Sequence, residues 1–279
     1  MHWRRGLTPT TLRWSALSFA NDKEGQKKRE MITINNVHKI FNPGKANQVN
    51  AVNGIDLNIR KEEFLVIVGA NGSGKTTLLD LVAGSVFPGS GSIEIDGKDV
   101  TKLPDYRRSQ WIARVFQNPM SGTASDLSIL DNFRLATIRT KPKGLSIGIN
   151  DTFKNQVKEK ISTLGMGLEN KIEQQMGTLS GGQRQALTLL MSVMDTCKVL
   201  LLDEPTAALD PRSADLVMRT ADEISKDYRL TVILITHNLK DAYKYGNRLI
   251  LMGEGKIVKD LNETEKAALK QNDLFDWFG

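Results

Sequence analysis

Apolar and polar residues alternate along two stretches near the start of the chain, residues 32–37 and 52–59. A period of two puts the apolar side chains on one face of a strand, so both stretches predict antiparallel strands with one face in water. Three later runs, 64–68, 199–202 and 232–235, are apolar throughout, and each leads into a helix-like segment. Strands buried on both faces belong in the middle of a parallel sheet, which predicts an α/β core.

The middle of the chain, residues 118–194, has a different pattern. Apolar residues recur there at helical spacing in three segments, which Lys-rich and Gly-rich stretches connect. The segments are 127–138, 151–165 and 181–194. We therefore predict an α-helical subdomain inserted into the α/β core. Beyond it, residues 246–260 predict a short hairpin, and a C-terminal helix is expected at about 262–275.

Composition and charge exclude several function classes. With one Cys and three His among 279 residues, neither an intrachain disulfide nor a thiolate zinc cluster is expected, and a reducing compartment is favoured. The net charge of +6 is concentrated in residues 1–30, so residues 31–279 carry only +2. That charge is too small for the basic surface of a nucleic-acid-binding domain. No run approaches the roughly 20 apolar residues of a membrane-spanning helix.

The first thirty residues differ from the rest. They are basic, rich in Ser, Thr and Trp, and have no continuous apolar core of the length that a secretory signal needs. Met31 stands directly before the first alternating stretch, so we expect the protein to start there and residues 1–30 to be a disordered or mis-assigned extension. A transit peptide is the alternative, because no acidic residue precedes Asp22. The domain itself is expected at 31–279.

A phosphate-binding loop is predicted at residues 69–77, GANGSGKTT, between an apolar strand and a helix-like segment. Glycines let backbone N–H groups approach phosphate oxygens, and the helix that follows directs its positive end at the anion. Lys75 is expected between the terminal phosphates of ATP, and the Thr76 hydroxyl is expected to bind Mg²⁺. The predicted loop residues are Gly69, Asn71, Gly72, Ser73, Gly74, Lys75, Thr76 and Thr77. A glycine-rich turn with an incidental lysine is the simpler alternative.

Two carboxylates, Asp203 and Glu204, end the apolar run VLLLDEP. Ligands of parallel sheets bind at the carboxyl ends of the strands. Two adjacent acids at such a place are costly unless a cation is near. We therefore expect Asp203 to hold Mg²⁺ through its water shell and Glu204 to face the attacking water. The alternative role for Asp203 is a helix N-cap.

The segment LSGGQ, residues 179–183, singles out one family among the nucleotide-binding proteins that share a phosphate loop and an acidic strand. With the phosphate loop, Gln117, LSGGQ, Asp203–Glu204 and His237 in this order, the chain resembles the ATP-binding cassette (ABC) ATPases over nearly all of residues 31–260. The resemblance implies a P-loop NTPase core, a parallel sheet with flanking helices, together with an antiparallel β subdomain and the inserted helical subdomain.

The resemblance also implies a head-to-tail homodimer with two composite ATP sites. Each site would combine the phosphate loop of one chain with the LSGGQ segment of the other. The residues of LSGGQ expected to contact the γ-phosphate are Ser180, Gly181, Gly182 and Gln183. Gly181 and Gly182 are poor residues for a first helical turn unless something approaches closely. The segment AALD, which ends at Asp210, resembles the loop that joins the two sites. The simpler role for Ser180 is a helix N-cap.

Three further residues receive roles from the resemblance. Gln117 would sense Mg²⁺ and the attacking water and connect them to a membrane partner, whereas His237 would contact the γ-phosphate and orient the water held by Glu204. Phe41 would stack on adenine, where Tyr is more usual in the family. Without the resemblance, Gln117 would be a surface residue, His237 a structural histidine and Phe41 an edge-strand core residue.

The function implied is an ATP-hydrolysing subunit of a transporter at the cytoplasmic face of the membrane. Its partners would be a second copy, integral membrane permease subunits docked on residues 118–139 and a solute-binding protein. Segments such as 122–133 and 144–153 resemble a bacterial importer group linked to tryptophan and tyrosine. The alternatives are a non-transport ABC ATPase of DNA repair, chromosome maintenance or the ribosome, and a scaffold with an inactive site. The low charge of the core argues against a nucleic-acid partner, and the intact Lys75, Glu204 and His237 argue against the scaffold.

Overall fold

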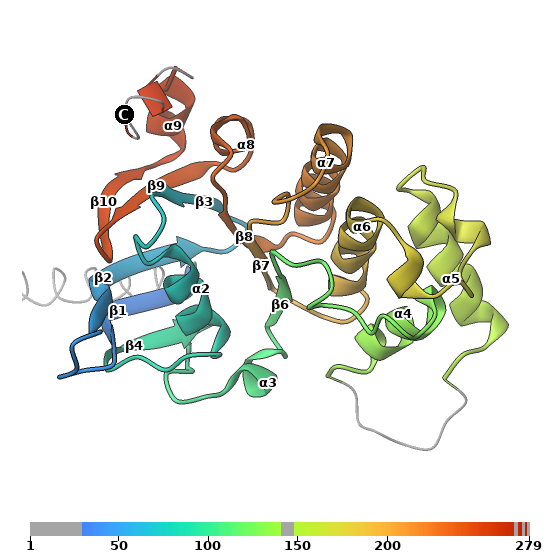
Figure 1. The fold of residues 1–279 in the computed structure, drawn as a ribbon, viewed down its shortest axis with the longest axis horizontal. Coiled ribbons are helices and arrows are strands. Elements are labelled where there is room, and N and C mark those ends of the chain that lie inside the picture. Colours follow the sequence, from blue (N-terminus) through green and yellow to red (C-terminus); the bar gives the residue numbers. More distant parts are fainter. Residues whose placement is uncertain (1–29, 141–147, 271–272, 275–276, 278–279) are drawn as a thin grey trace, which may run out of the picture.

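The computed structural model describes residues 30–140, 148–270, 273–274 and 277 (Figure 1). The predicted extension at residues 1–30 lies outside these residues except for Glu30, which already pairs with Arg60 in the first strand. Within the described residues, no helix is both long enough and apolar enough to cross a bilayer.

An antiparallel sheet forms the first layer and has the strand order β2-β1-β4-β5 in the described part of the chain. Its strands are β1 (Glu30–Phe41), β2 (Val49–Arg60), β4 (Ser90–Ile95) and β5 (Lys98–Asp99). The alternation at 32–37 and 52–59 places Ile32 opposite Ile59 and Ile34 opposite Leu57, all four buried. The predicted antiparallel strands are confirmed. Apolar and polar residues alternate in them because only one face of this sheet packs on the core.

A second sheet has the order β10-β9-β3-β8-β7-β6 among the described strands. These are β3 (Phe64–Gly69), β6 (Ile112–Val115), β7 (Val199–Asp203), β8 (Thr231–Ile235), β9 (Arg248–Gly253) and β10 (Lys256–Leu261). The pairs are parallel except for the antiparallel hairpin β9–β10. The three fully apolar runs are β3, β7 and β8, which are inner strands of this sheet, as predicted, and are neighbours in the order β3-β8-β7.

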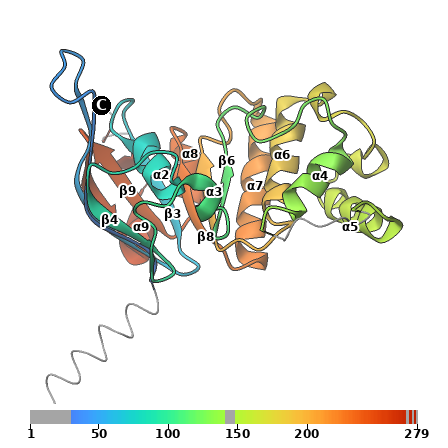
Figure 2. The same cartoon turned by 90° about the horizontal axis from the view of Figure 1, so that it is seen from below.

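The helices cover both faces of the parallel sheet (Figures 1 and 2). They are α2 (Lys75–Ala83), α3 (Asp105–Arg108), α4 (Ile129–Thr137), α5 (Asp151–Ser162), α6 (Gly181–Ser192), α7 (Pro211–Asp227), α8 (Leu239–Lys244) and α9 (Glu263–Ala268), with 3-10 turns η1 (Leu168–Asn170) and η2 (Met176–Thr178). Leu65 and Ile67 of β3 face a core shared with α2 and the antiparallel sheet. Phe64, Val66 and Val68 face the core under the other helices.

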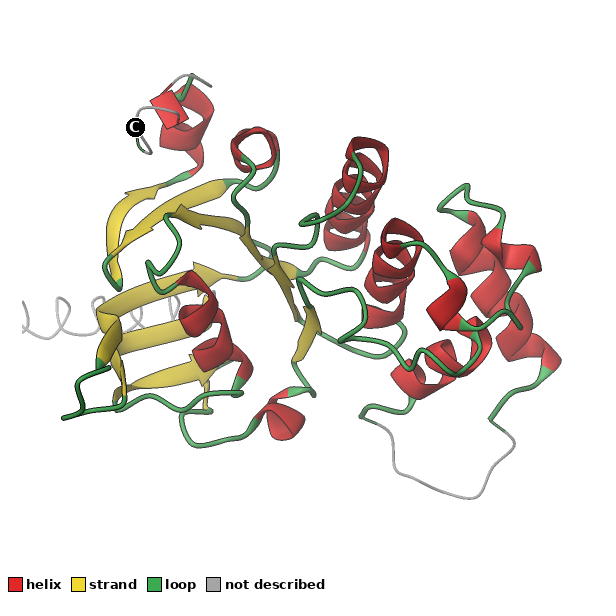
Figure 3. Ribbon diagram, in the orientation of Figure 1, coloured by secondary structure: helices red, strands yellow, loops and turns green. Residues whose placement is uncertain are grey.

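The three predicted helical segments in 118–194 form α4, α5 and α6 (Figure 3). Helices α4 and α5 lie away from the antiparallel sheet in both cartoon views. Helix α6 packs on β6 and α7, and its apolar residues belong to the same core cluster as Leu200 and Leu202 of β7. The insert is therefore joined to the α/β core through α6.

The predicted C-terminal helix at 262–275 is wrong in extent. Helix α9 covers Glu263–Ala268, and Leu269 is extended, with φ −64° and ψ 143°. The turn away from helical geometry allows Leu274 to be completely buried in the main core. Residues 273–274 are helical again, so the predicted helix is interrupted after Ala268.

Candidate nucleotide-binding site

The phosphate loop joins β3 to α2, as predicted, and exposes the unprotected start of that helix. Gly74 is the N-cap residue with φ 98°, so no side chain caps α2, and no acid stands in its first turn. The first N–H groups of a helix have no partner within the helix, and the helix dipole adds positive potential there. This end of α2 therefore presents donors to an anion.

Two of the loop glycines are required for different reasons, one for lack of space and the other for its backbone conformation. A Cβ on Gly74 would lie 2.2 Å from the carbonyl oxygen of Ala51, far below contact distance. Gly72 has open space around it, but its φ of 79° lies in the left-handed region that glycine adopts most easily. The close approach at Gly74 ties the loop to β2.

Lys75 is positioned by the loop itself. Its ammonium donates to the carbonyl oxygens of Gly69 and Ala70, each at 2.9 Å, and the residue is only 5% exposed. Burial lowers the pKa of Lys75, an effect that the nearby carboxylates of Glu204 and Asp203 oppose. A terminal phosphate would place a further negative charge next to this buried ammonium.

Strands β6, β7 and β8 bring Gln117, Glu204 and His237 together at their carboxyl ends. His237 Nε2 lies 2.5 Å from Glu204 Oε1, and Gln117 Nε2 donates to Glu204 Oε2 at 3.2 Å. Glu204 has φ 46°, a left-handed conformation that is uncommon for a residue with a side chain. Strain of this kind is concentrated at functional sites, because the surrounding structure must hold it. Here the backbone N–H of Glu204 donates to Ile235 O at 2.9 Å and holds that geometry.

The groups predicted to bind Mg²⁺ have suitable chemistry. Asp203 is 6% exposed, and Arg114 donates to its Oδ2 at 2.8 Å. Within the described part of the chain, Asp203 Oδ1 and the Thr76 hydroxyl make no hydrogen bond, so both oxygens are available. Oxygen ligands from one carboxylate and one hydroxyl, completed by water and phosphate, are what Mg²⁺ takes in nucleotide sites.

A cavity of about 380 Å³ brings half of the predicted site residues together. Nine of them line it: Phe41, Asn71, Gly72, Gly74, Lys75, Thr76, Thr77, Glu204 and His237. Phe41 stands at its edge, 36% exposed, next to Val49 and Ala51 of β2, which the sequence analysis missed. Gly69, Ser73 and Asp203 are buried behind the lining, and Gln117 reaches the site through Glu204.

The other predicted residues lie outside this cavity. Ser180 is the N-cap of α6 in a capping box with Gln183, and Asp210 is the N-cap of α7, where hydrogen bonds from Ser213 lower its pKa. Ser180 and Gly181 are exposed. Gly182 is buried, and a Cβ there would lie 2.4 Å from that of Ser213. The close approach at Gly182 is thus a contact between α6 and α7 within one chain, which the sequence analysis did not anticipate.

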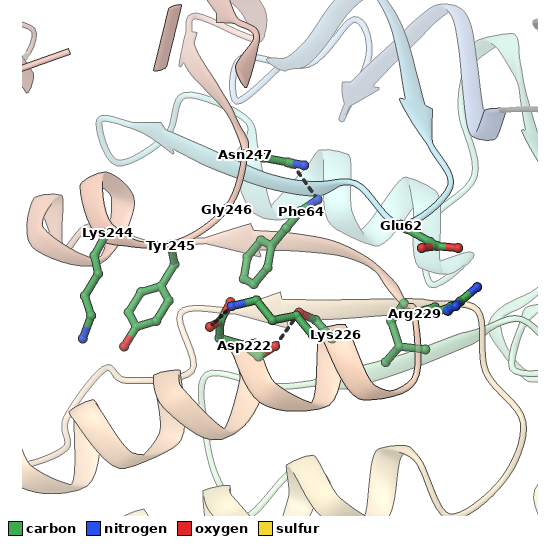
Figure 4. Close-up of a pocket in the computed structure, with 11 residues that line it drawn as sticks. Glu62, Phe64, Asp222, Lys226, Arg229, Lys244, Tyr245, Gly246 and Asn247 are labelled. Carbon is green, nitrogen blue, oxygen red and sulfur yellow. Dashed lines mark hydrogen bonds and ion pairs between the residues drawn. The ribbon is translucent and has the colours of Figure 1, made fainter. Parts of the chain in front are cut away.

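A larger cavity, about 730 Å³, lies where β3, β8 and β9 begin (Figure 4). Two of its cations are already paired with acids, Lys226 with Asp222 at 2.7 Å and Lys244 with Asp215 at 3.4 Å. It has no glycine loop and no free helix N-terminus directed into it. The smaller cavity therefore matches the chemistry predicted for a nucleotide site better than the larger one does, in spite of its size.

Comparison with known proteins agrees with this geometry. The model of the family "ABC transporter" matches residues 52–207. The tyrosine transport ATP-binding protein of Clostridioides difficile (strain R20291) is 36% identical, over 89% of this chain and 98% of that protein. The energy-coupling factor transporter ATP-binding protein EcfA2 of Clostridium perfringens (strain 13 / Type A) is 31% identical, over 82% of this chain and 79% of that protein.

Solved structures show the same architecture. A dimeric ATP-binding cassette in a post-hydrolysis state, bound to ADP and phosphate, has a TM-score of 0.72 and 26% identity, over 84% of this chain and 99% of that chain. The fold class expected from the sequence is confirmed. The match over residues 52–207 includes the phosphate loop, LSGGQ and the carboxylates at the end of β7. The chain therefore belongs to the ABC transporter family, as an ATP-hydrolysing subunit.

Proposed function

We propose that two copies of this chain bind two ATP molecules between them and drive a separate membrane permease. The observation that carries the proposal is the division of the site residues into two sets. Lys75, Glu204 and His237 line the nucleotide cavity, whereas Ser180 and Gly181 are exposed at the start of α6. A head-to-tail dimer would bring the second set of one chain to the nucleotide cavity of the other.

Hydrolysis in this site would be a positioning problem. A water attacks the γ-phosphorus, its proton passes to the carboxylate of Glu204, and ADP leaves. His237 and Gln117 each hold one oxygen of Glu204, so they fix the direction in which the carboxylate faces. Lys75 and the start of α2 stabilise negative charge on the phosphates. Thr76 and Asp203 would hold Mg²⁺, which neutralises phosphate charge when bound.

A large cavity beside the site fits the dimer. It measures about 770 Å³ and runs from Glu204 and His237 to Leu209 and Pro211, so it adjoins the loop that contains Asp210. A partner chain could enter the site from this side. The Asp210 loop would then lie between the two nucleotides, which supports its proposed role in joining them.

Residues 118–139 are the proposed permease-docking surface. Three of its apolar side chains, Met120, Leu127 and Leu135, are 55%, 40% and 49% exposed and so are accessible to an apolar partner surface. The segment begins directly after Gln117, so a movement of a docked permease helix would reach Glu204 through one side chain. The subunit would lie at the cytoplasmic face of the membrane.

The cargo we propose is a small solute taken up by the cell, such as an aromatic amino acid, delivered by a solute-binding protein. Support comes from the 36% identity over 98% of the tyrosine transport relative. The competing non-transport function has no comparable support, because the two relatives above are both transport proteins by name. Uptake of labelled tyrosine by a deletion strain, with and without this chain, tests the cargo.

A mixing experiment tests the composite site. Glu204→Gln disables the nucleotide cavity of its own chain, and Ser180→Arg blocks the contact to the cavity of the partner. Each variant alone should be nearly inactive. A mixed dimer has one intact site, so an equimolar mixture should recover up to about a quarter of the wild-type rate of phosphate release. A mixture as inactive as its components would contradict the shared site, and absence of any permease after detergent extraction would contradict the transport role.

A further inference from the structure

One arginine in β6 contacts two carboxylates, one of which belongs to Asp203, a proposed ligand of Mg²⁺. Arg114 Nη1 donates to Asp80 Oδ1 at 2.6 Å, and Arg114 Nη2 donates to Asp203 Oδ2 at 2.8 Å. The side chain is 12% exposed, and its guanidinium lies 4.8 Å from the ring centroid of Phe116. Three elements, α2, β6 and β7, therefore meet at a single guanidinium.

Of the two acids that Arg114 joins, Asp203 is itself a proposed ligand of Mg²⁺, and Asp80 is in the same helix as the other proposed ligand, Thr76. Asp80 is four residues after Thr76 in α2, so both side chains lie on the same face of that helix. Asp203 provides the carboxylate. The guanidinium thus sets the separation between the helix face that bears Thr76 and the end of β7.

Only arginine can make this connection with one side chain. Its planar fork presents several N–H groups in fixed directions, whereas a lysine ammonium is a single point charge. Arg114 occupies one oxygen of Asp203, Oδ2, and thereby fixes the direction of the other, Oδ1. A buried carboxylate also needs a partner for stability alone, so a purely structural role is the alternative that must be tested.

We propose that Arg114 is a positioning residue for magnesium, holding Asp203 so that its free oxygen faces the site. The inference rests on the proposed magnesium site and extends it to a residue outside the family motifs identified in the sequence. Arg114 is also three residues before Gln117, in the strand that leads to the proposed docking surface. The same side chain therefore connects the metal carboxylate to the strand whose end would contact the permease.

The test is the contribution of magnesium to nucleotide binding, measured by calorimetry without turnover. ATP affinity is compared in Mg²⁺ and in EDTA for the wild type and for Arg114→Met, which keeps the volume and removes the charge. We expect the Mg²⁺-to-EDTA affinity ratio to fall about tenfold, as for loss of the hydrogen-bond partner of a metal ligand. Affinity in EDTA should change less than about twofold. Arg219→Met, which removes an exposed ion pair in α7, is the matched control.

Two further variants separate positioning from general stability. Asp203→Asn should lower the ratio as well, and adding Arg114→Met to it should have little extra effect, because both changes act on one carboxylate. Arg114→Lys should give an intermediate ratio, and it decides the question if the Met variant does not fold.

Several outcomes would overturn the inference. Equal losses in Mg²⁺ and in EDTA would show a structural role only, and an unchanged ratio in the Lys variant would contradict the need for the two-pronged contact of arginine. A larger ratio would mean that the arginine weakens Mg²⁺ binding by its charge. If the wild type itself binds ATP equally in Mg²⁺ and EDTA, the proposed magnesium site fails, which is a different result.

Discussion

Replacing Glu204 by Gln tests the assignment of the proton acceptor most directly. The change removes one negative charge and the basic oxygen but keeps the length of the side chain. Glu and Gln have the same steric strain at φ 46°, so the substitution adds no new backbone strain. An amide oxygen can still accept from His237 or Gln117, whose nitrogens lie 2.5 Å and 3.2 Å from the carboxylate. The geometry should therefore survive while the chemistry is lost.

The expected loss in turnover follows from the role of a general base. Such a group contributes about 10²- to 10⁴-fold. We expect kcat for phosphate release at saturating Mg·ATP to fall by at least about a hundredfold, or about 3 kcal/mol in activation free energy. The affinity for ATP should be retained, because Lys75 and the α2 terminus are untouched. Light scattering should then detect a stable ATP-bound dimer.

Glu62→Gln is the matched control for this variant. Glu62 also has a left-handed φ, 64°, but it is exposed just before the amino end of β3, where it lines the larger cavity. Its substitution should leave turnover unchanged, and both variants should unfold within about 0.5 kcal/mol of the wild type. A Glu204→Gln protein that keeps near-normal turnover would refute the assignment of Glu204 as the base.

Three further substitutions, the first of them with a control, test other parts of the structure. Gly74→Ala places a Cβ against Ala51 O and should lower ATP affinity by more than about tenfold in calorimetry, whereas Gly97→Ala, with a similar φ and open space, should cost only about 1 kcal/mol of stability. Arg108→Met removes a fully buried guanidinium that donates to the last carbonyls of α2, so chemical denaturation should show a loss of about 3–4 kcal/mol. Burial lowers the pKa of Lys266 to about 8, below its unfolded value, so the unfolded chain binds more protons above pH 8. Wild-type stability relative to Lys266→Met should therefore rise between about pH 8 and pH 10, by roughly 1 kcal/mol per pH unit, and a flat difference would contradict the shift.

Strand pattern was the strongest predictor of the fold because burial alone decides it. Strand β3 is apolar at every position, and the structure gives the reason: Leu65 and Ile67 enter one core while Phe64 and Val66 enter the other. Residues 52–59 alternate because only one face of the antiparallel sheet is covered. Both patterns are local consequences of where water is excluded, so both could be predicted.

Predictions that depended on competition between local preference and tertiary packing were less successful. The polar segment after residue 262 predicts one helix to about 275, whereas α9 ends at Ala268 and the completely buried Leu274 belongs to the main core. Similarly, nothing in the sequence indicates that Ser213 of α7 lies against Gly182, where a Cβ would be 2.4 Å from that of Ser213. In both cases the deciding neighbour lies elsewhere in the chain, and no periodicity marks it.

The same distinction explains which site residues the sequence could reveal. Lys75, Glu204 and His237 occur in short motifs whose chemistry is evident locally, and the structure places all three on one cavity. Arg114 has no such motif, since its partners are 34 and 89 residues away, and an arginine within a short strand has no obvious role. Residues that would contact the nucleotide can thus be found from sequence motifs. A residue that fixes the position of those residues is found only in the structure, where strands distant in sequence lie next to each other. Arg114 contacts Asp203 and belongs to the strand that leads to Gln117. Its substitution should therefore weaken metal binding and permease coupling together, whereas substitution of a single motif residue would not reveal that the two are connected.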